Sequence, residues 1–349
     1  MERKRREQCA AEAQNLMAAA FTSPLWDRAE GKWFRTLSLE DGATDRRPHF
    51  YYDLCNIYAF ARAMRLAPDL AAWRGPWMDA VNWLFRTFKD RDWVGYDGFE
   101  ARDKRDQYSM ALAPAALAEA FALAGRPALR GFAEALSRRY RERFPVGAVR
   151  NVQASHHAIL SALALGDATG DAGYLADARA EAAFLVDRCR FPNGPAAGCF
   201  TDDVRQTAFP RHCYGSWAMT ALAERDADER WPAAAATSME WWRTRQLPDG
   251  GFPFFFDARA GDWSDRTVYS VHQKGMFLHS AGAIDRCAQG RYAPMIERAM
   301  ACCDSDEWRY VSPNGWSCFR RSDADPGVVY SYELGWEVLG LTLVARNGG

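Results

Sequence analysis

The amino-acid sequence predicts an all-α protein in which six helical hairpins form a closed ring. Two observations predict this fold. Short clusters of aromatic and polar residues recur about every 50–60 residues along the chain. Each cluster opens a helix-length segment rich in small apolar residues, and a second helix usually follows it. The clusters are Tyr51–Asp53, Gln107–Ser109, Gln153–His157, His212–Tyr214, Tyr269–Gln273 and Tyr330–Glu333.

The first predicted hairpin illustrates the helical spacing. In Leu54–Met64, apolar residues recur three and four positions apart, and the segment ends before Pro68. Trp77–Phe88 places Val81 and Leu84 on one face of a second helix. The same spacing predicts four more hairpins, which are Tyr108–Leu123 with Ala128–Phe144, Ser155–Leu165 with Tyr174–Arg188, Tyr214–Glu224 with Pro232–Arg245, and Val268–Arg286 with Tyr292–Cys303.

The sequence also predicts how the ring closes and which helices form its inner layer. A final helix, Tyr330–Arg346, should pair with an N-terminal helix near Arg5–Phe21 and close the circle. Within each hairpin the first helix is rich in Ala, Gly, Ser, Leu and Met, whereas the second carries more Arg, Glu and Asp. Because helices that are apolar on most faces are buried, the first helices should form an inner ring.

The predicted connections alternate in length. Short turns such as 166–171 lead from inner to outer helices, whereas long loops lead to the next inner helix. The long loops are 89–106, 191–210, 247–267 and 304–327. Loops of more than about 12 residues usually have a function, and all of these lie where the inner helices begin. No linker divides the chain, so a single toroid domain, 1–349, is expected.

Composition indicates a globular protein with no affinity for nucleic acid. Of the 349 residues, 48% are hydrophobic and 26% are charged, and the formal net charge is −1. These values exclude a disordered chain and a basic nucleic-acid-binding surface. No apolar run reaches the roughly 18 residues needed to span a bilayer, and no apolar signal segment follows the charged N-terminus. We therefore expect a cytoplasmic protein of undetermined oligomeric state. The nine cysteines form no CxxC pair, so neither a metal site nor a cofactor is expected.

The helical repeat resembles the (α/α)6 toroid superfamily, which includes six-hairpin glycosidases and terpenoid cyclases. The resemblance extends over nearly the whole chain and rests on the repeat, not on a catalytic motif. Gln246–Phe252 is similar to a Q-x-x-D-G-G/S-F/W element of several toroid enzymes. Members of the superfamily also include polysaccharide lyases, sugar epimerases and linalool dehydratase-isomerase, and no single subfamily is matched. The resemblance implies that a substrate enters at the N-termini of the inner helices.

Candidate catalytic groups lie at the predicted starts of inner helices. His272, in the first turn of its helix, has a side chain suited to proton transfer near neutral pH. His156 and His157 point about 100° apart on a helix, so at most one of them faces the centre squarely. The other predicted catalytic residues are Tyr214, Glu333 and Asp53. A carboxyl group among aromatic rings can act as a general acid, although the helix N-terminus also favours such a charge without any catalytic role.

Polar and aromatic side chains near the same level are predicted to bind the substrate. Phenols form hydrogen bonds with sugar hydroxyls, and tryptophan rings can stack on a sugar. The predicted substrate-binding residues are Tyr52, Tyr108, Asn151, Gln153, His157, His212, Tyr269, Gln273, Tyr332, Trp263 and Trp316. Asp202 or Asp203 could supply another acid. Arginines near this rim, Arg205 and Arg211 among them, would favour an anionic substrate such as a uronate, but ion pairing explains them equally.

These residues predict a carbohydrate-active enzyme that uses general acid–base chemistry on a sugar or glycan. Hydrolysis needs two carboxylates across the substrate, whereas β-elimination and epimerisation need a histidine or tyrosine base. The His- and Tyr-rich lining therefore favours a lyase or an epimerase/isomerase over a hydrolase. Two alternatives remain open: a terpenoid cyclase or dehydratase-isomerase with an aromatic-lined cavity, and a toroid that binds a glycan without turnover. The expected partner is a small-molecule or oligosaccharide substrate.

Overall fold

The computed structural model of the chain describes most of its residues. The described ranges are 2–47, 49–91, 93–95, 104–148, 151–203, 205–265, 290–303, 309–311, 317–319 and 327–346. Within them the architecture is all-α, with short strands in the connections. None of the helices in these ranges is long and apolar enough to cross a membrane.

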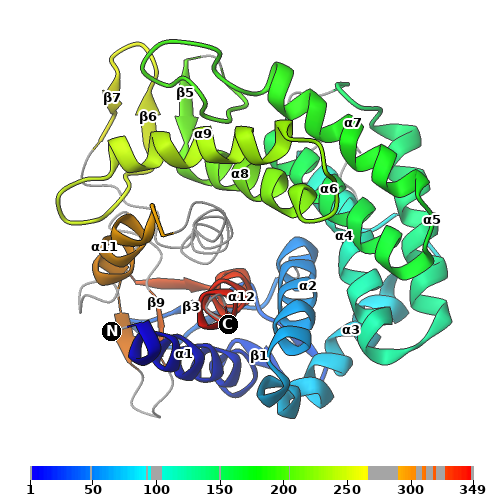
Figure 1. The fold of residues 1–349 in the computed structure, drawn as a ribbon. Helices are drawn as coiled ribbons and strands as arrows, with labels where there is room; N and C mark the ends of the chain where they lie inside the picture. The colour runs from blue at the N-terminus through cyan, green and yellow to red at the C-terminus, as the bar shows by residue number, and fades with distance from the viewer. Residues whose placement is uncertain are drawn as a thin grey trace.

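The helices form the predicted ring of two layers (Figure 1). The inner helices are α2 (Phe50–Leu66), α4 (Lys104–Ala124), α6 (Val152–Thr169), α8 (Phe209–Ala223) and α12 (Ser331–Arg346). Around the ring, α12 contacts α2, α2 contacts α4, α4 contacts α6, and α6 contacts α8. The predicted fifth inner helix, Val268–Arg286, lies outside the described residues.

The outer helices pair with the inner ones as the sequence predicts. They are α3 (Arg74–Phe88), α5 (Pro127–Arg143), α7 (Gly173–Arg188), α9 (Arg230–Arg245) and α11 (Ala293–Cys303), and a 3₁₀ helix, η1 (Pro68–Trp73), precedes α3. Contacts join α3 to α2, α5 to α4, α7 to α6 and α9 to α8. The N-terminal helix α1 (Glu2–Thr22) packs on α12, which confirms the predicted closure of the circle.

In the described residues, the polar clusters lie within the first two turns of the inner helices, except Tyr330, which directly precedes α12. The helix α2 begins at Phe50 and α8 begins at Phe209, each several residues before the start predicted from apolar spacing. Pro210 is tolerated at the start of α8 because the first N–H groups of a helix have no intrahelical acceptor. The cluster side chains are therefore held by helical backbone, which fixes their directions.

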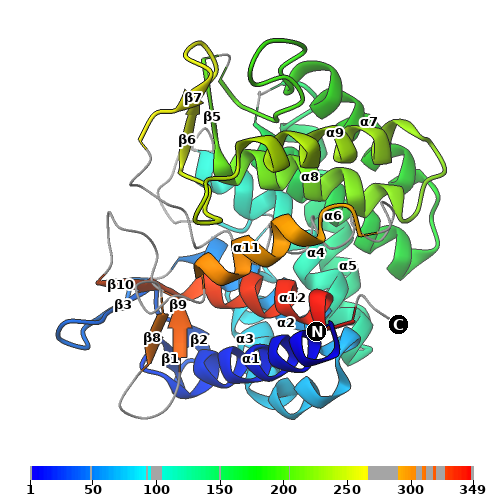
Figure 2. The ribbon, with the colours of Figure 1, turned by 60° about the vertical axis from the view of Figure 1, so that its left-hand side comes forward.

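Short antiparallel strands occupy the connections, including three of the predicted long loops. They are β1 (Trp26–Asp27), β2 (Lys32–Trp33), β3 (Thr36–Ser38), β4 (Thr44–Asp45), β5 (Gln206–Ala208), β6 (Phe255–Asp257), β7 (Asp262–Trp263), β8 (Arg309–Val311), β9 (Ser317–Phe319) and β10 (Val328–Tyr330). The sheets are β1–β2, β10–β3–β4, β5–β6–β7 and β8–β9. Figure 2 shows these strands gathered on one side of the molecule, where α8 and α12 begin. The β3–β10 pair joins the two ends of the chain a second time.

A serine from α6 bonds to the backbone of α4 beside Pro114. Pro114 lies inside α4 and cannot donate a backbone hydrogen bond. The Ser161 hydroxyl takes the place of the helical bond between Ala115 and Ala111, because it accepts from the Ala115 N–H at 3.0 Å and donates to the Ala111 carbonyl at 2.6 Å. Insertion of a side chain into the helical ladder opens the helix. A cavity of about 210 Å³ lies beside this opening, between the inner helices α4 and α6 and the outer helices α5 and α7.

Candidate active site

The hydroxyl of Tyr51 is the meeting point of three inner helices. It lies 3.0 Å from Nε2 of His157 on α6 and 3.2 Å from the hydroxyl of Tyr214 on α8. Because α4 and α6 separate α2 from α8 along the ring, the contact between Tyr51 and Tyr214 crosses the centre of the toroid. Tyr51 is 6% exposed, and Tyr214 and His157 are fully buried or nearly so. The structure thus brings His157 and Tyr214, two predicted site residues, together around Tyr51, which the sequence analysis does not predict.

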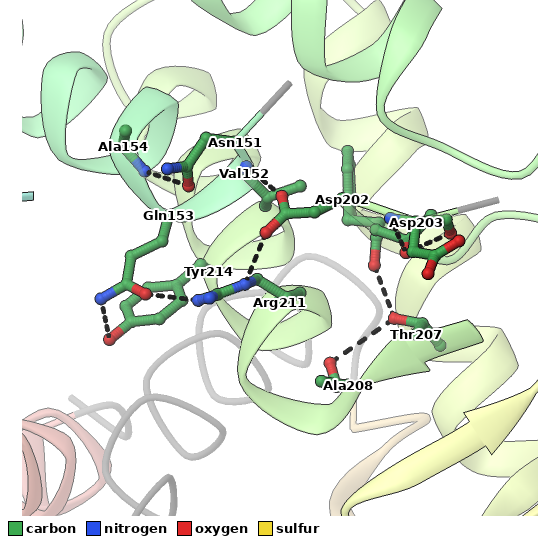
Figure 3. Close-up of polar contacts among 12 residues, drawn as sticks. Asn151, Val152, Gln153, Ala154, Asp202, Asp203, Thr207, Ala208, Arg211 and Tyr214 are labelled. Atoms are coloured by element: carbon green, nitrogen blue, oxygen red, sulfur yellow. Dashed lines mark hydrogen bonds and ion pairs between the residues drawn. The ribbon is translucent and has the colours of Figure 1, made fainter. Parts of the chain in front are cut away.

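An amide and a guanidinium extend this cluster. Gln153 on α6 donates from Nε2 to the Tyr51 hydroxyl at 2.6 Å and, more weakly, to the Tyr214 hydroxyl at 3.3 Å. Arg211 on α8 donates to Gln153 Oε1 and, at 3.1 Å, to the hydroxyl of Tyr108 on α4. Figure 3 shows Arg211 lying between Gln153 and a carboxylate from the loop after α7. Hydrogen bonds therefore link α2, α4, α6 and α8.

The carboxylate belongs to Asp202. Its Oδ2 lies 2.7 Å from Nε of Arg211, and its Oδ1 accepts the backbone N–H of Val152 at 2.6 Å. The ion pair is largely shielded, since the side chains of Arg211 and Asp202 are 25% and 18% exposed. Of the two sequence interpretations of Arg211, the structure supports ion pairing, because an internal carboxylate already neutralises its charge.

The two adjacent histidines have different surroundings. His157 faces Tyr51, whereas His156 packs against the rings of Tyr214 and Trp217, with centroids 4.9 Å and 4.8 Å away. The Nδ1 atoms of the two histidines lie 3.1 Å apart, so one ring donates to the other. Burial, with the nearby Arg211 charge, lowers the pKa of His157 to about 3. This imidazole is therefore neutral at physiological pH.

The phenols keep their protons for the same physical reason. Burial raises the pKa of Tyr51 and Tyr214 well above the usual value for tyrosine. It also raises the pKa of Tyr108, although the nearby Arg211 charge partly offsets this rise. A dry site disfavours the charged form of every group in it. The centre of the toroid accordingly presents uncharged hydrogen-bonding groups around Tyr51.

Aromatic rings from both ends of the chain line the adjoining side. Tyr52 stacks on His49 with centroids 3.5 Å apart and lies 4.3 Å from the ring of Tyr332 on α12. The Tyr51 and Tyr332 centroids are 6.4 Å apart. Glu333, next in sequence, is 2% exposed in the first turn of α12, where the helix N-terminus favours a negative charge. Tyr52 and Tyr332 therefore adjoin the central cluster.

Other predicted site residues have structural partners. Asp53 accepts the backbone N–H of Trp33 at 3.1 Å, which ties α2 to the β1–β2 ribbon. Burial raises the pKa of Asp53 to about 8. Asn151 caps α6 by accepting from the Ala154 N–H, and it donates to Gln107. These contacts give Asp53 and Asn151 local roles in addition to any role toward a substrate.

His212 and Trp263, two of the predicted substrate-binding residues, lie in the hydrophobic core. The His212 ring accepts the Phe200 N–H at Nδ1 and has Ser238 oxygens 3.0 Å and 3.2 Å from Nε2. Trp263, in β7, donates to the Arg245 carbonyl at 3.0 Å and is 8% exposed. Both nitrogens of His212 have protein partners, and the Trp263 ring packs on other core rings. The predicted residues His272, Tyr269, Gln273 and Trp316 lie outside the described residues.

Tyr51 was missed because an inner helix is buried on almost every side. Apolar spacing therefore says little about which of three successive residues faces the centre, and the prediction falls on Tyr52 and Asp53 instead of Tyr51. One signal was available: Tyr51 is in phase with Tyr58, seven residues later and also buried.

In the part of the chain that the structure describes, no group of three or more His, Cys, Asp or Glu residues could hold a metal ion.

No family model and no curated protein matches this sequence. Solved structures do match over nearly the whole chain. A sugar epimerase from a ruminal bacterium is 13% identical, with a TM-score of 0.73 over 96% of this chain and 98% of that chain. A D-mannose isomerase is 14% identical, with a TM-score of 0.74 over 97% of both chains. An inactive α-1,6-mannanase variant from a Salegentibacter species, with two adjacent aspartates replaced, is 10% identical, with a TM-score of 0.68 over 97% of this chain and 99% of that chain.

These three proteins are named as carbohydrate-active enzymes, and at such low identity the likeness concerns the fold. It agrees with the order of inner and outer helices described above and with the closure of α1 on α12. The chain has the (α/α)6 toroid fold.

Proposed function

We propose that this protein is a sugar epimerase or isomerase that moves a proton on a carbon next to a sugar carbonyl. The observation that carries the proposal is the uncharged hydrogen-bonded chain at the centre of the toroid, from Tyr214 through Tyr51 to His157 and His156. Such groups can hold and pass protons without the two opposed carboxylates that glycoside hydrolysis requires. The TM-scores of the epimerase and the isomerase, 0.73 and 0.74, point in the same direction.

In the proposed reaction, a base removes a proton from the carbon beside the carbonyl and leaves an enediolate. Neutral donors aimed at the oxygen where negative charge develops stabilise this intermediate. The hydroxyl of Tyr214 is such a donor, since burial keeps this phenol protonated, and Tyr51 links it to His157 by hydrogen bonds. Return of the proton to the same carbon on its other face gives an epimer, and return to the neighbouring carbon gives an isomer. Atoms and charge balance without any redox partner.

The proton-moving groups are assigned from position. The pair His156 and His157 continues the chain away from Tyr51. His272 and Glu333, at the starts of the fifth and sixth predicted inner helices, remain the candidates for the second proton-transfer group. A neutral sugar is favoured over a uronate, because Asp202 already neutralises Arg211. The polar groups around Tyr51 also favour a carbohydrate over a terpenoid, whose cyclisation needs an apolar aromatic cavity.

Deuterium exchange tests the proposal directly. The protein is incubated in D₂O with mannose, glucose, fructose, cellobiose, glucuronate, a mannan or a prenyl alcohol, and proton NMR follows the hydrogen beside the carbonyl. We expect exchange at that carbon and formation of an epimer or isomer from at least one neutral sugar. Release of reducing ends from a mannan without exchange, or conversion of the prenyl alcohol alone, would contradict the proposal.

Removal of one oxygen atom tests the role of Tyr51. The Tyr51→Phe variant should lower the exchange rate by about a hundredfold or more, the usual contribution of a positioned acid or base. Tyr58→Phe is the matched control: it makes the same change on the same helix at a buried tyrosine whose ring packs on Trp336. Equal rates for the two variants would show that the Tyr51 hydroxyl takes no part in turnover.

A further inference from the structure

The hydroxyl proton of Tyr51 has two acceptors within reach, Nε2 of His157 at 3.0 Å and the Tyr214 oxygen at 3.2 Å. We propose that Asp202, Arg211 and Gln153 are positioning residues that direct this proton to His157. The effect on turnover rests on the proposed function, but the direction of the proton can be measured without any substrate.

The orientation of the Gln153 amide follows from its charged neighbour. A guanidinium has only donors, and Nη1 of Arg211 contacts Oε1 of Gln153, so this atom is the carbonyl oxygen. The amide nitrogen then faces the two phenols, at 2.6 Å from Tyr51 and 3.3 Å from Tyr214. A donor is thereby held against the Tyr51 oxygen, which must send its own proton elsewhere.

His157 is the better of the two acceptors. Its ring is neutral, because burial lowers its pKa to about 3, and a neutral imidazole has one nitrogen with a free lone pair. If Nε2 accepts from Tyr51, Nδ1 carries the proton and donates to Nδ1 of His156, 3.1 Å away. An imidazole nitrogen is a much stronger base than a phenol oxygen, so the Tyr51 proton goes to His157, and the Tyr214 hydroxyl donates to the Tyr51 oxygen.

Asp202 holds Arg211, the residue that orients the Gln153 amide, in place. Its Oδ2 engages Nε of Arg211, so the Nη atoms point toward Gln153 and Tyr108. Its Oδ1 accepts the Val152 N–H at the first turn of α6, the helix that carries Gln153. The Asp202 carboxylate therefore fixes the Arg211 guanidinium and also the start of α6, as Figure 3 shows. The guanidinium in turn orients the Gln153 amide on that helix.

The next residue offers a matched comparison. Asp203 is exposed, and its Oδ1 accepts the backbone N–H of Arg205 at 2.9 Å. Among the described residues, its carboxylate forms neither an ion pair with Arg211 nor a hydrogen bond with α6. Substitution of Asp202 and Asp203 by asparagine thus makes the same chemical change at neighbouring positions, and only one of them belongs to the positioning chain.

Nitrogen-15 NMR of labelled histidine shows which ring nitrogen of His157 carries the proton, and therefore whether Tyr51 donates to it. In the ligand-free protein at pH 7, we expect His157 to carry its proton on Nδ1, with Nε2 accepting from Tyr51. The Gln153→Glu variant keeps the size of the side chain and the contact with Arg211 but offers Tyr51 an acceptor. We expect His157 to change to the Nε2–H tautomer in that variant. An Nε2–H tautomer in the unmodified protein, or no change in the variant, would overturn the proposal.

Kinetics then separate positioning from general stability. On a sugar that the protein converts, Asp202→Asn should lower kcat by at least about tenfold with little change in KM, because only proton transfer is impaired. Asp203→Asn should change kcat by less than about twofold. Equal losses in the two variants would refute the positioning role. If no sugar is converted, the proposed function fails, whereas the tautomer measurement still decides this inference.

Discussion

Buried histidines and buried carboxyl groups make the stability of this protein depend on pH in opposite directions. Burial lowers the pKa of His157 and His212 to about 3, whereas it raises that of Asp53 to about 8 and that of Glu181 to about 7. In each case the charged form is penalised by the loss of water. The histidines therefore weaken the fold as pH falls, and the carboxyl groups weaken it as pH rises.

His212 gives a prediction in the acidic range. Its folded pKa is about 3 and its usual value is 6.5, so the unfolded chain takes up a proton first. The stability it contributes is present above pH 6.5 and is lost as pH falls toward 3. In His212→Gln, the amide can contact the same Phe200 and Ser238 groups without titrating. The loss of unfolding free energy between pH 7 and pH 5, measured with urea, should shrink by up to about 2 kcal/mol. An unchanged loss would contradict the assignment.

Asp53 gives the opposite prediction in the alkaline range. Its folded pKa of about 8 exceeds its usual 3.8, so stability is lost as pH rises through 8. Asp53→Asn keeps an oxygen for the Trp33 N–H and carries no charge. We therefore expect its melting temperature, relative to the unmodified protein, to rise between pH 5 and pH 9. Asp53→Ala, as the control, should be destabilised at both pH values because the Trp33 N–H loses its acceptor. A relative melting temperature that is flat with pH would show that Asp53 is already ionised.

At the scale of elements, packing between inner helices depends on residues without side-chain bulk. The Gly335 N–H on α12 donates to Oδ1 of Asn56 on α2 at 3.1 Å. A Cβ atom at Gly335 would lie 2.6 Å from that oxygen and 3.0 Å from the Asn56 Cα. The close contact between α2 and α12 thus needs glycine at this position. On α5, by contrast, a Cβ at the exposed Gly131 would meet nothing within 4 Å.

The two glycines should respond to alanine with opposite signs. Gly335→Ala overpacks the α2–α12 contact and should lower the free energy of unfolding by about 1–3 kcal/mol. Gly131→Ala should raise it by about 0.5–1 kcal/mol, because alanine favours the helix and glycine does not. Chemical denaturation of both variants checks the pair. Stabilisation by Gly335→Ala would mean that the helices are farther apart than the structure has them.

The helices were predictable from local spacing, whereas the strands and the site geometry were not. Apolar residues three and four apart mark α3 and the other helices without reference to the rest of the chain. The pairing of Val328 with Ser38 depends on residues far apart in the sequence, and three-residue segments carry no periodic signal. Asp53 likewise turns toward Trp33, a partner that exists only after folding. The polar clusters predict the residues around the candidate site, but burial on every side of α2 concealed that Tyr51 lies at the centre of the hydrogen-bonded cluster.

At the scale of the whole molecule, the site exists only when the ring is closed. Its hydrogen-bonded groups come from α2, α4, α6 and α8, and Tyr332 adds a ring from α12. The packing of α1 on α12 and the pairing of β3 with β10 join the chain's two ends. A defect in that closure should therefore reach the site, even when it lies on α1 and touches none of the site residues.

Leu16 on α1 offers the test of this coupling. It is 1% exposed, and Leu16→Ala should lower the free energy of unfolding by about 2–5 kcal/mol, the usual cost of such a cavity. If the chain is one domain, helix content by far-ultraviolet circular dichroism and the His157 NMR signal should be lost together, at one lowered midpoint. Asn15→Ala, at an exposed neighbour on the same helix, should leave that midpoint almost unchanged. Early loss of α1 with the His157 signal intact would show that the central cluster holds without ring closure, and that the chain contains more than one cooperative unit.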